Sequence, residues 1–111
     1  MSPLFGKKQY VYALAELIED GRALANQELG KIKYRDYRGA EPTVEILVHV
    51  LPESEPPFES KMKAGVSRSI LLKPGVRVHV KYEPNRKGQV LLEDELQAIL
   101  ERNPQLIKTG K

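Results

Sequence analysis

Hydrophobic and polar residues alternate most strictly between two turn signals in the second half of the chain. Pro74 and Gly75 form one turn, and Pro84 ends the segment that follows. Between these turns, apolar and polar residues take opposite sides of an extended chain: Val76, Val78, Val80 and Tyr82 on one side, and Arg77, His79 and Lys81 on the other. This period of two residues predicts a strand with one buried face. It indicates a half-buried antiparallel β module.

Other segments show the same period between turn signals. Residues 43–51, 58–66 and 89–92 are predicted strands, and the proline-rich loop 52–57 between the first two cannot join the interior of a sheet. Residues 30–38 alternate as well, and we predict one long first strand that begins near Arg22. The Ala, Leu and Glu content of residues 22–28 also fits a helix, so this alternative stays open.

Two segments instead repeat their apolar residues at three- and four-residue steps, which is the spacing of one helical face. The first covers residues 9–20, and Gly21 is suited to end it as a C-cap. The second covers residues 94–103, where Asn103 precedes a proline that stops a helix. The apolar residues are Tyr10, Ala13, Leu14, Leu17 and Ile18 in the first segment, and Leu96, Ile99 and Leu100 in the second. We therefore expect an N-terminal and a C-terminal helix.

Length and composition fit one small globular domain. The chain has 111 residues, of which 41% are hydrophobic and 30% charged. The predicted fold is mostly β, of the β+α class, with about five antiparallel strands in a small barrel or strongly curved sheet. Residues 1–8 are expected to be a flexible lead, residues 9–103 the single domain with its flanking helices, and residues 104–111 a tail.

Cysteine content and hydropathy limit the compartment. The chain has no cysteine, which excludes disulfides, thiol catalysis and cysteine-based zinc sites, and which fits a reducing compartment. No apolar run is long enough for a signal peptide or a membrane span. We therefore expect a cytoplasmic protein that does not span a membrane.

The two histidines are the first candidates for metal chemistry. His49 and His79 fall on the polar sides of predicted strands, and two imidazoles beside Glu45 would make a minimal metal site if the strands pair. However, Arg77 and Lys81 flank His79 on the same side, and these cations repel a metal ion. We expect solvated strand residues and no metal site.

Catalytic patterns are equally weak. None of the candidate serines lies in a Gly-x-Ser-x-Gly turn, and no glycine-rich loop suited to phosphate is present. Glu53 and Glu55 lie on a proline-rich loop, where we expect no burial that would raise the pKa of one of them. We expect neither an enzyme nor a bound cofactor.

Basic residues gather on predicted strand faces. If the first strand pairs with the valine-rich strand, the cations form a stripe of the kind that binds a phosphate backbone, with one tyrosine able to stack on a base. These candidate nucleic-acid-binding residues are Lys31, Lys33, Arg35, Tyr37, Arg77 and Lys81. The net charge is only +3, and outward lysines and arginines also protect strand edges from aggregation. Solvated strand faces are therefore the simpler interpretation.

Four short strings, together with a predicted helix that ends at Asp20-Gly21 before a long first strand, give a resemblance that covers roughly residues 14–92. The strings are Pro56-Pro57-Phe58-Glu59, Leu72-Lys73-Pro74-Gly75, the valine-rich strand ending in Glu83-Pro84, and Val90-Leu91-Leu92. The chain resembles a family of uncharacterised small bacterial β domains. It departs from them by having Glu83 where aspartate is usual and by its C-terminal helix. The resemblance implies a compact, barrel-like five-stranded sheet and brings no catalytic residue.

Together these observations predict a non-catalytic β domain, either structural or a protein-interaction module. Nucleic-acid binding through the cationic strand face is the alternative. The apolar faces of the two predicted helices either cover the sheet or pair with a second copy, so we expect a monomer or a homodimer, and the identity of any protein partner stays open.

Overall fold

The computed structural model describes residues 9–31 and 41–107. Its strands are β1 (Val11–Leu17), β2 (Thr43–Leu51), β3 (Phe58–Gly65), β4 (Arg77–Tyr82) and β5 (Gln89–Leu92). Its helices are α1 (Gly21–Lys31), α2 (Val66–Ser69), α3 (Leu96–Arg102) and a 3-10 turn, η1 (Pro104–Ile107). Strands β2 to β5 and helix α3 lie close to their predicted positions.

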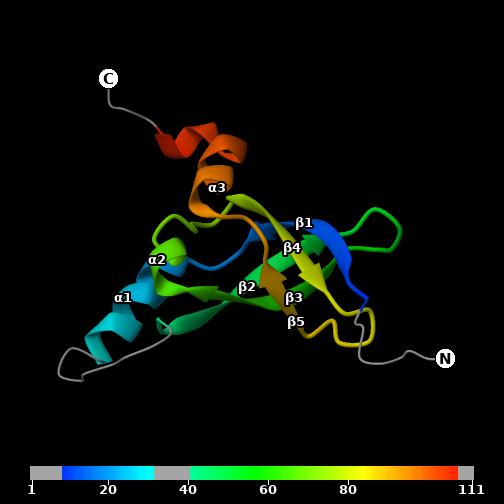
Figure 1. The fold of residues 1–111 in the computed structure, drawn as a ribbon, viewed down its shortest axis with the longest axis horizontal. Coiled ribbons are helices and arrows are strands. Elements are labelled where there is room, and N and C mark those ends of the chain that lie inside the picture. Colours follow the sequence, from blue (N-terminus) through cyan, green and yellow to red (C-terminus); the bar gives the residue numbers. More distant parts are fainter. Residues whose placement is uncertain (1–8, 32–40, 108–111) are drawn as a thin grey trace.

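The strands form a closed barrel in the order β1-β2-β3-β5-β4, and β4 returns to pair with β1 (Figure 1). The predicted small barrel is therefore confirmed. One detail differs, because β3 and β5 are parallel whereas the other neighbours are antiparallel. A five-stranded β-barrel is also the architecture of the OB-fold.

The predicted helix over residues 9–20 is wrong, because most of this segment is strand β1. The residues of this segment fit two periods equally well, the two-residue period of a strand and the three- to four-residue steps of a helix. In the structure they follow the strand period: inward residues are Val11, Ala13, Ala15 and Leu17, and outward residues are Tyr12, Leu14 and Glu16. Strand pairing decides between the two periods. β1 pairs with β2 along one edge and with β4 along the other, so both of its edges are hydrogen-bonded.

The predicted long first strand from Arg22 is also wrong, because Gly21–Lys31 is helix α1. Asp20 begins this helix as an N-cap: its Oδ1 accepts hydrogen bonds from the amides of Arg22 at 3.0 Å and Ala23 at 3.2 Å. The cap and the helix-forming composition together outweigh the alternation further along the chain. The rest of the predicted strand, residues 32–38, lies outside the described residues.

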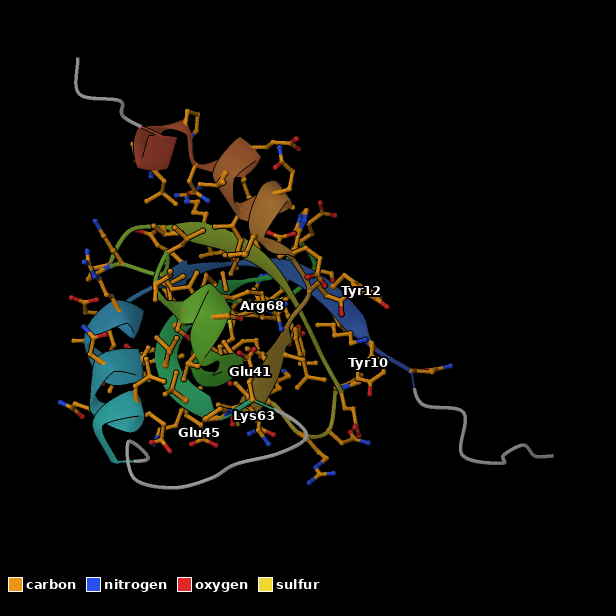
Figure 2. The ribbon with its side chains drawn as sticks, turned by 60° about the vertical axis from the view of Figure 1, so that its left-hand side comes forward. Tyr10, Tyr12, Glu41, Glu45, Lys63 and Arg68 are labelled. Atoms are coloured by element: carbon orange, nitrogen blue, oxygen red, sulfur yellow. The ribbon has the colours of Figure 1, made fainter. Side chains whose placement is uncertain are left out.

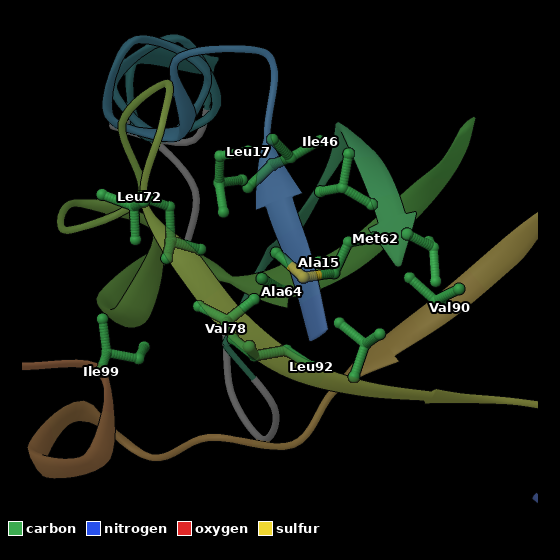
Figure 3. Close-up of a cluster of buried hydrophobic side chains, with 14 of the residues drawn as sticks. Ala15, Leu17, Ile46, Met62, Ala64, Leu72, Val78, Val90, Leu92 and Ile99 are labelled. Carbon is green, nitrogen blue, oxygen red and sulfur yellow. The ribbon is translucent and has the colours of Figure 1, made fainter. Parts of the chain in front are cut away.

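Inward side chains of all five strands fill the barrel (Figure 3). Ala15 lies among larger residues at the centre of the cluster, while Leu72 and Ile99 lie at one end of it. Both residues come from outside the strands and are fully buried, so the segment before β4 and helix α3 close this end. The buried hydrophobic strand residues are Ala13, Ala15, Leu17, Val44, Ile46, Val48, Val50, Met62, Ala64, Val78, Val80, Tyr82, Val90 and Leu92.

Helix α3 is held to β4 by two buried polar side chains. β5 pairs with β4 only at Val80 and Lys81, so the amides at the start of β4 need other acceptors. Asp94, 7% exposed, accepts from the amide of His79 at 2.9 Å. The side chain of Asn103, 3% exposed, makes two hydrogen bonds to the backbone of Arg77: it accepts from the amide at 2.9 Å and donates to the carbonyl at 2.7 Å. These two side chains bind the backbone of β4 where a neighbouring strand would otherwise pair with it, and they thereby hold α3 against the barrel.

Two glycines of α1 provide a matched test of this packing. A Cβ on Gly21 would lie 2.8 Å from the carbonyl oxygen of Leu72, whereas a Cβ on Gly30 meets nothing within 4 Å. We expect Gly21→Ala to lower the free energy of unfolding by about 1–3 kcal/mol, because the backbone at Leu72 must shift. Gly30→Ala should raise it by about 0.5–1 kcal/mol through helix propensity. Urea denaturation of both variants checks this, and equal effects at the two positions would contradict the packing.

Candidate functional site

Three residues of the predicted cationic stripe lie in the described part of the chain: Lys31, Arg77 and Lys81. Arg77 and Lys81 lie on the outer side of β4, as predicted. Lys31 is instead the last residue of α1, and this helix packs on α2 and β2, so it does not share a strand face with β4. Lys33, Arg35 and Tyr37 lie outside the described residues. The stripe as predicted is therefore not assembled by the described part of the chain.

Both cations on β4 have an acidic partner. Nη2 of Arg77 lies 3.4 Å from Oε1 of Glu16, and Nζ of Lys81 lies 3.0 Å from Oε2 of Glu93. The bond to Glu93 raises the pKa of Lys81, which keeps its ammonium charged. Partnered surface cations of this kind bind an external phosphate only by exchanging one anion for another.

A row of outward side chains crosses the barrel wall at right angles to the strands. Tyr12 on β1 is in register with Lys81 on β4, which is in register with Leu91 on β5. Leu91 in turn faces Lys63 on β3, whose ammonium makes no ion pair with the described residues. We call Tyr12, Lys81, Leu91 and Lys63 the transverse row. Its aromatic end is open to solvent, because Tyr12 is 62% exposed.

Tyr10 lies beside this row. It is two residues from Tyr12, so both side chains lie on the same side of β1 (Figure 2). Nζ of Lys81 lies 4.8 Å from the centroid of the Tyr10 ring, which is a cation–π distance. The sequence interpretation missed both tyrosines because it placed them on a helix, although their alternation with Val11 and Ala13 was a usable strand signal.

A hollow of about 530 Å³ opens next to Tyr10, at the loop between β4 and β5. Arg86 brings a cation that has no ion pair among the described residues, and Gln89 brings an amide that donates to Glu45 at 3.2 Å. We call this feature the loop hollow. Its lining residues are Tyr10, Tyr82, Glu83, Arg86, Gly88, Gln89 and Leu91. Aromatic, aliphatic, amide, carboxylate and guanidinium groups thus meet in one concave site, which suits a planar ring with polar edges.

The inner wall of the hollow is fixed by Tyr82. Its hydroxyl donates to Oε2 of Glu55 at 2.6 Å, and the other carboxylate oxygen of Glu55 accepts from Lys87. The ring of Phe58 packs edge-on against Tyr82 with the centroids 5.2 Å apart. Bonds from Lys87 and Tyr82 lower the pKa of Glu55, while burial and the bond to Glu55 raise the pKa of Tyr82 to about 12.

The histidines do not meet. Nδ1 of His79 lies 2.9 Å from Nη2 of Arg102, so it acts as an acceptor and helps hold α3. His49 lies on β2 opposite Glu59 of β3. Residues 9–31 and 41–107 contain no group of three or more His, Cys, Asp or Glu side chains suited to hold a metal ion. Within the same residues, no helix combines the length and the apolar character needed to cross a membrane.

Comparisons with known proteins add no assignment. No protein-family model, curated protein or solved structure significantly matches this chain. The resemblance to small bacterial β domains therefore stays a prediction that rests on the quoted residues.

The Tyr82–Glu55 pair predicts a specific loss of stability in alkali. The tyrosine has its ordinary pKa near 10 when unfolded and about 12 when folded, so its contribution is complete below pH 10 and is lost as the pH rises towards 12. We expect the free energy of unfolding to fall more steeply over this range in the wild type than in Tyr82→Phe. Urea titrations at several pH values measure the difference, and Tyr12→Phe serves as the exposed control. Equal slopes in the wild type and Tyr82→Phe would contradict the assignment.

Proposed function

We propose that this chain is a non-catalytic binding module whose ligand is single-stranded nucleic acid. The bases stack on Tyr12 and enter the loop hollow, and the phosphates contact the lysines of the transverse row. The observation that carries this proposal is the exposed Tyr12 in register with Lys81, beside a hollow lined by Tyr10 and Arg86. Stacking on aromatic side chains within a cationic groove is how proteins bind single strands without reading their sequence.

The dimensions of the surface support a short single strand. The transverse row crosses β1, β4, β5 and β3, and at about 4.8 Å per strand it extends about 14 Å. A paired duplex offers no free base to Tyr12, because its bases stack on one another. We therefore expect single strands to bind more tightly than duplexes of the same sequence.

The charges predict weak binding with a modest dependence on salt. Lys63 and Arg86 make no ion pair with the described residues, whereas Lys81 must leave Glu93 to contact a phosphate. About three phosphate contacts on a single strand give a slope of about −2 in log affinity against log salt. Stacking must then supply a large share of the affinity, which makes Tyr12 the decisive residue.

The topology supports the same ligand class by analogy alone. Barrels of the OB-fold bind oligonucleotides and oligosaccharides on the face of their second and third strands and on the loops β1–β2 and β4–β5, and the loop hollow lies at the β4–β5 loop. The transverse row crosses β1, β4, β5 and β3, so the analogy supports the hollow and not the row. A fold does not define a function, so the proposal depends on the side chains. The absence of cysteine fits a cytoplasmic site of action, with the protein a monomer or a homodimer.

A second candidate function is protein interaction, which is favoured by a separate groove beside α1 whose lining includes Ile70, Leu71 and Leu106. This groove has its own residues and its own expected partner, so the two functions are compatible.

Substitution of Tyr12 tests the proposed function. We expect Tyr12→Ala to weaken binding of a mixed-sequence single strand of about 12 nucleotides by about tenfold, since stacking contributes about 1–3 kcal/mol per base. Tyr12→Phe keeps the ring and should bind like the wild type. Fluorescence anisotropy at about 50 and about 200 mM salt measures both effects, and raising the salt should weaken wild-type binding by about tenfold to twentyfold.

The control for this test is Leu96→Ala, which removes an exposed apolar side chain of α3 that belongs neither to the transverse row nor to the loop hollow. It should leave the affinity unchanged. Three results would overturn the proposal: no binding at the lower salt concentration, equal binding by Tyr12→Ala and the wild type, or a preference for duplex.

A further inference from the structure

A second concave surface lies beside α1, on side chains that the proposed nucleic-acid site does not use. It is a groove of about 420 Å³ between α1, the segment after α2, and η1. We call it the helix groove. Its lining residues are Arg22, Asn26, Ile70, Leu71, Lys73 and Leu106.

The apolar floor of the groove follows from the turn after α2. The amide of Leu71 donates to the carbonyl of Arg68 at 3.1 Å, and the amide of Leu72 donates to that of Ser69 at 3.0 Å. This tight turn buries Leu72 completely in the barrel and leaves Ile70 47% exposed. Leu71 is only partly buried against the core. Two neighbouring aliphatic side chains are therefore available to a partner.

Helix α1 extends this surface along its length. Arg22, Asn26 and Leu29 are separated by four and three residues, so they share one side of the helix. Leu29 is among the exposed large apolar residues, whereas Ala25 is fully buried on the side that packs on the barrel. The groove thus continues into an exposed helical stripe with an apolar end.

The groove carries two positive charges that have no acidic partner among the described residues. Arg22 and Lys73 make no side-chain ion pair with any described residue, and none of the six lining residues is acidic. Four cations elsewhere do face carboxylates: Arg77 faces Glu16, Lys81 faces Glu93, Lys87 faces Glu55 and Arg102 faces Asp94. The helix groove is therefore a place where the described part of the chain leaves cations beside apolar surface.

We propose that the helix groove binds an acidic amphipathic helix of a partner protein. Its apolar side chains would lie on Ile70, Leu71 and Leu106, and its carboxylates would face Arg22 and Lys73. A helix that lays one apolar face in a groove is a common mode of peptide recognition. Charge complementarity with the rim selects an acidic rather than a basic partner and sets the orientation of the helix. This inference names the partner class for the second candidate function, and it does not depend on nucleic-acid binding.

A pair of designed peptides tests the inference. Both contain about 16 residues with leucine at i, i+3, i+4 and i+7, and their polar positions are filled by glutamate in one and by lysine in the other. Fluorescence anisotropy of labelled peptides should give at least tenfold tighter binding of the glutamate peptide. The double variant Arg22→Glu, Lys73→Glu should reverse this preference, because the rim changes sign.

Two further variants distinguish binding in the helix groove from nonspecific attraction between the peptide and the cations of the protein. Ile70→Glu introduces a carboxylate at an already exposed position, so the fold is retained, and it should weaken binding of the glutamate peptide by at least tenfold. Arg86→Glu removes one charge of the loop hollow and should leave peptide binding unchanged while weakening oligonucleotide binding. The proposals for the helix groove and for the loop hollow can therefore be tested separately.

Four outcomes would overturn the helix groove as an acidic-partner site. The first is equal binding of the two peptides by the wild type, and the second is a preference for the glutamate peptide that survives in the double charge variant. The third is competition between the single-stranded oligonucleotide and the peptide, which would assign the groove to nucleic acid. The fourth is a dimer by light scattering that Ile70→Glu dissociates, which would assign the groove to a second copy of the chain.

Discussion

Closure of the barrel through β1 is the constraint on which the rest of the structure depends. β1 is the strand that pairs with both β2 and β4, so it joins the two ends of the sheet. Because side chains alternate along a strand, this pairing sends Ala13 and Ala15 inward and Tyr12 outward; a slip of one residue would exchange the two sets. The position of the aromatic side chains on the surface is thus a consequence of how the barrel closes.

Incomplete pairing on the other side of β4 has its own consequence. β5 is short, and the free amides at the start of β4 are satisfied by Asp94 and Asn103, which brings α3 against the barrel. The same short strand leaves a loop before it that carries Arg86 beside Tyr10 and forms the loop hollow. One feature of the topology therefore accounts for both the covering helix and the concave site.

The sequence predicts the strands whose alternation is bounded by turn residues, and these are β2 to β5. It does not predict β1, because the segment from Tyr10 to Ile18 satisfies both periods and only pairing with distant strands decides between them. It offers α1 only as the alternative to a strand over residues 22–28. Asp20 was a local signal for the start of α1 that the interpretation overlooked. For the candidate site, the outward positions of Arg77 and Lys81 follow from alternation. Their ion pairs and the tyrosines beside them depend on register between strands far apart in sequence, which no local pattern contains.

The most direct measurement is a titration of isotope-labelled protein with a short single-stranded oligonucleotide, followed by amide chemical shifts. It reports where a ligand lies without altering any side chain. We expect the largest changes at residues 10–12, where β1 begins, at Lys81 and across residues 86–91, with little change at Ile70 or Leu106. Changes confined to the helix groove, or none at a ligand concentration that saturates anisotropy, would contradict the claim that barrel closure presents a binding surface for bases.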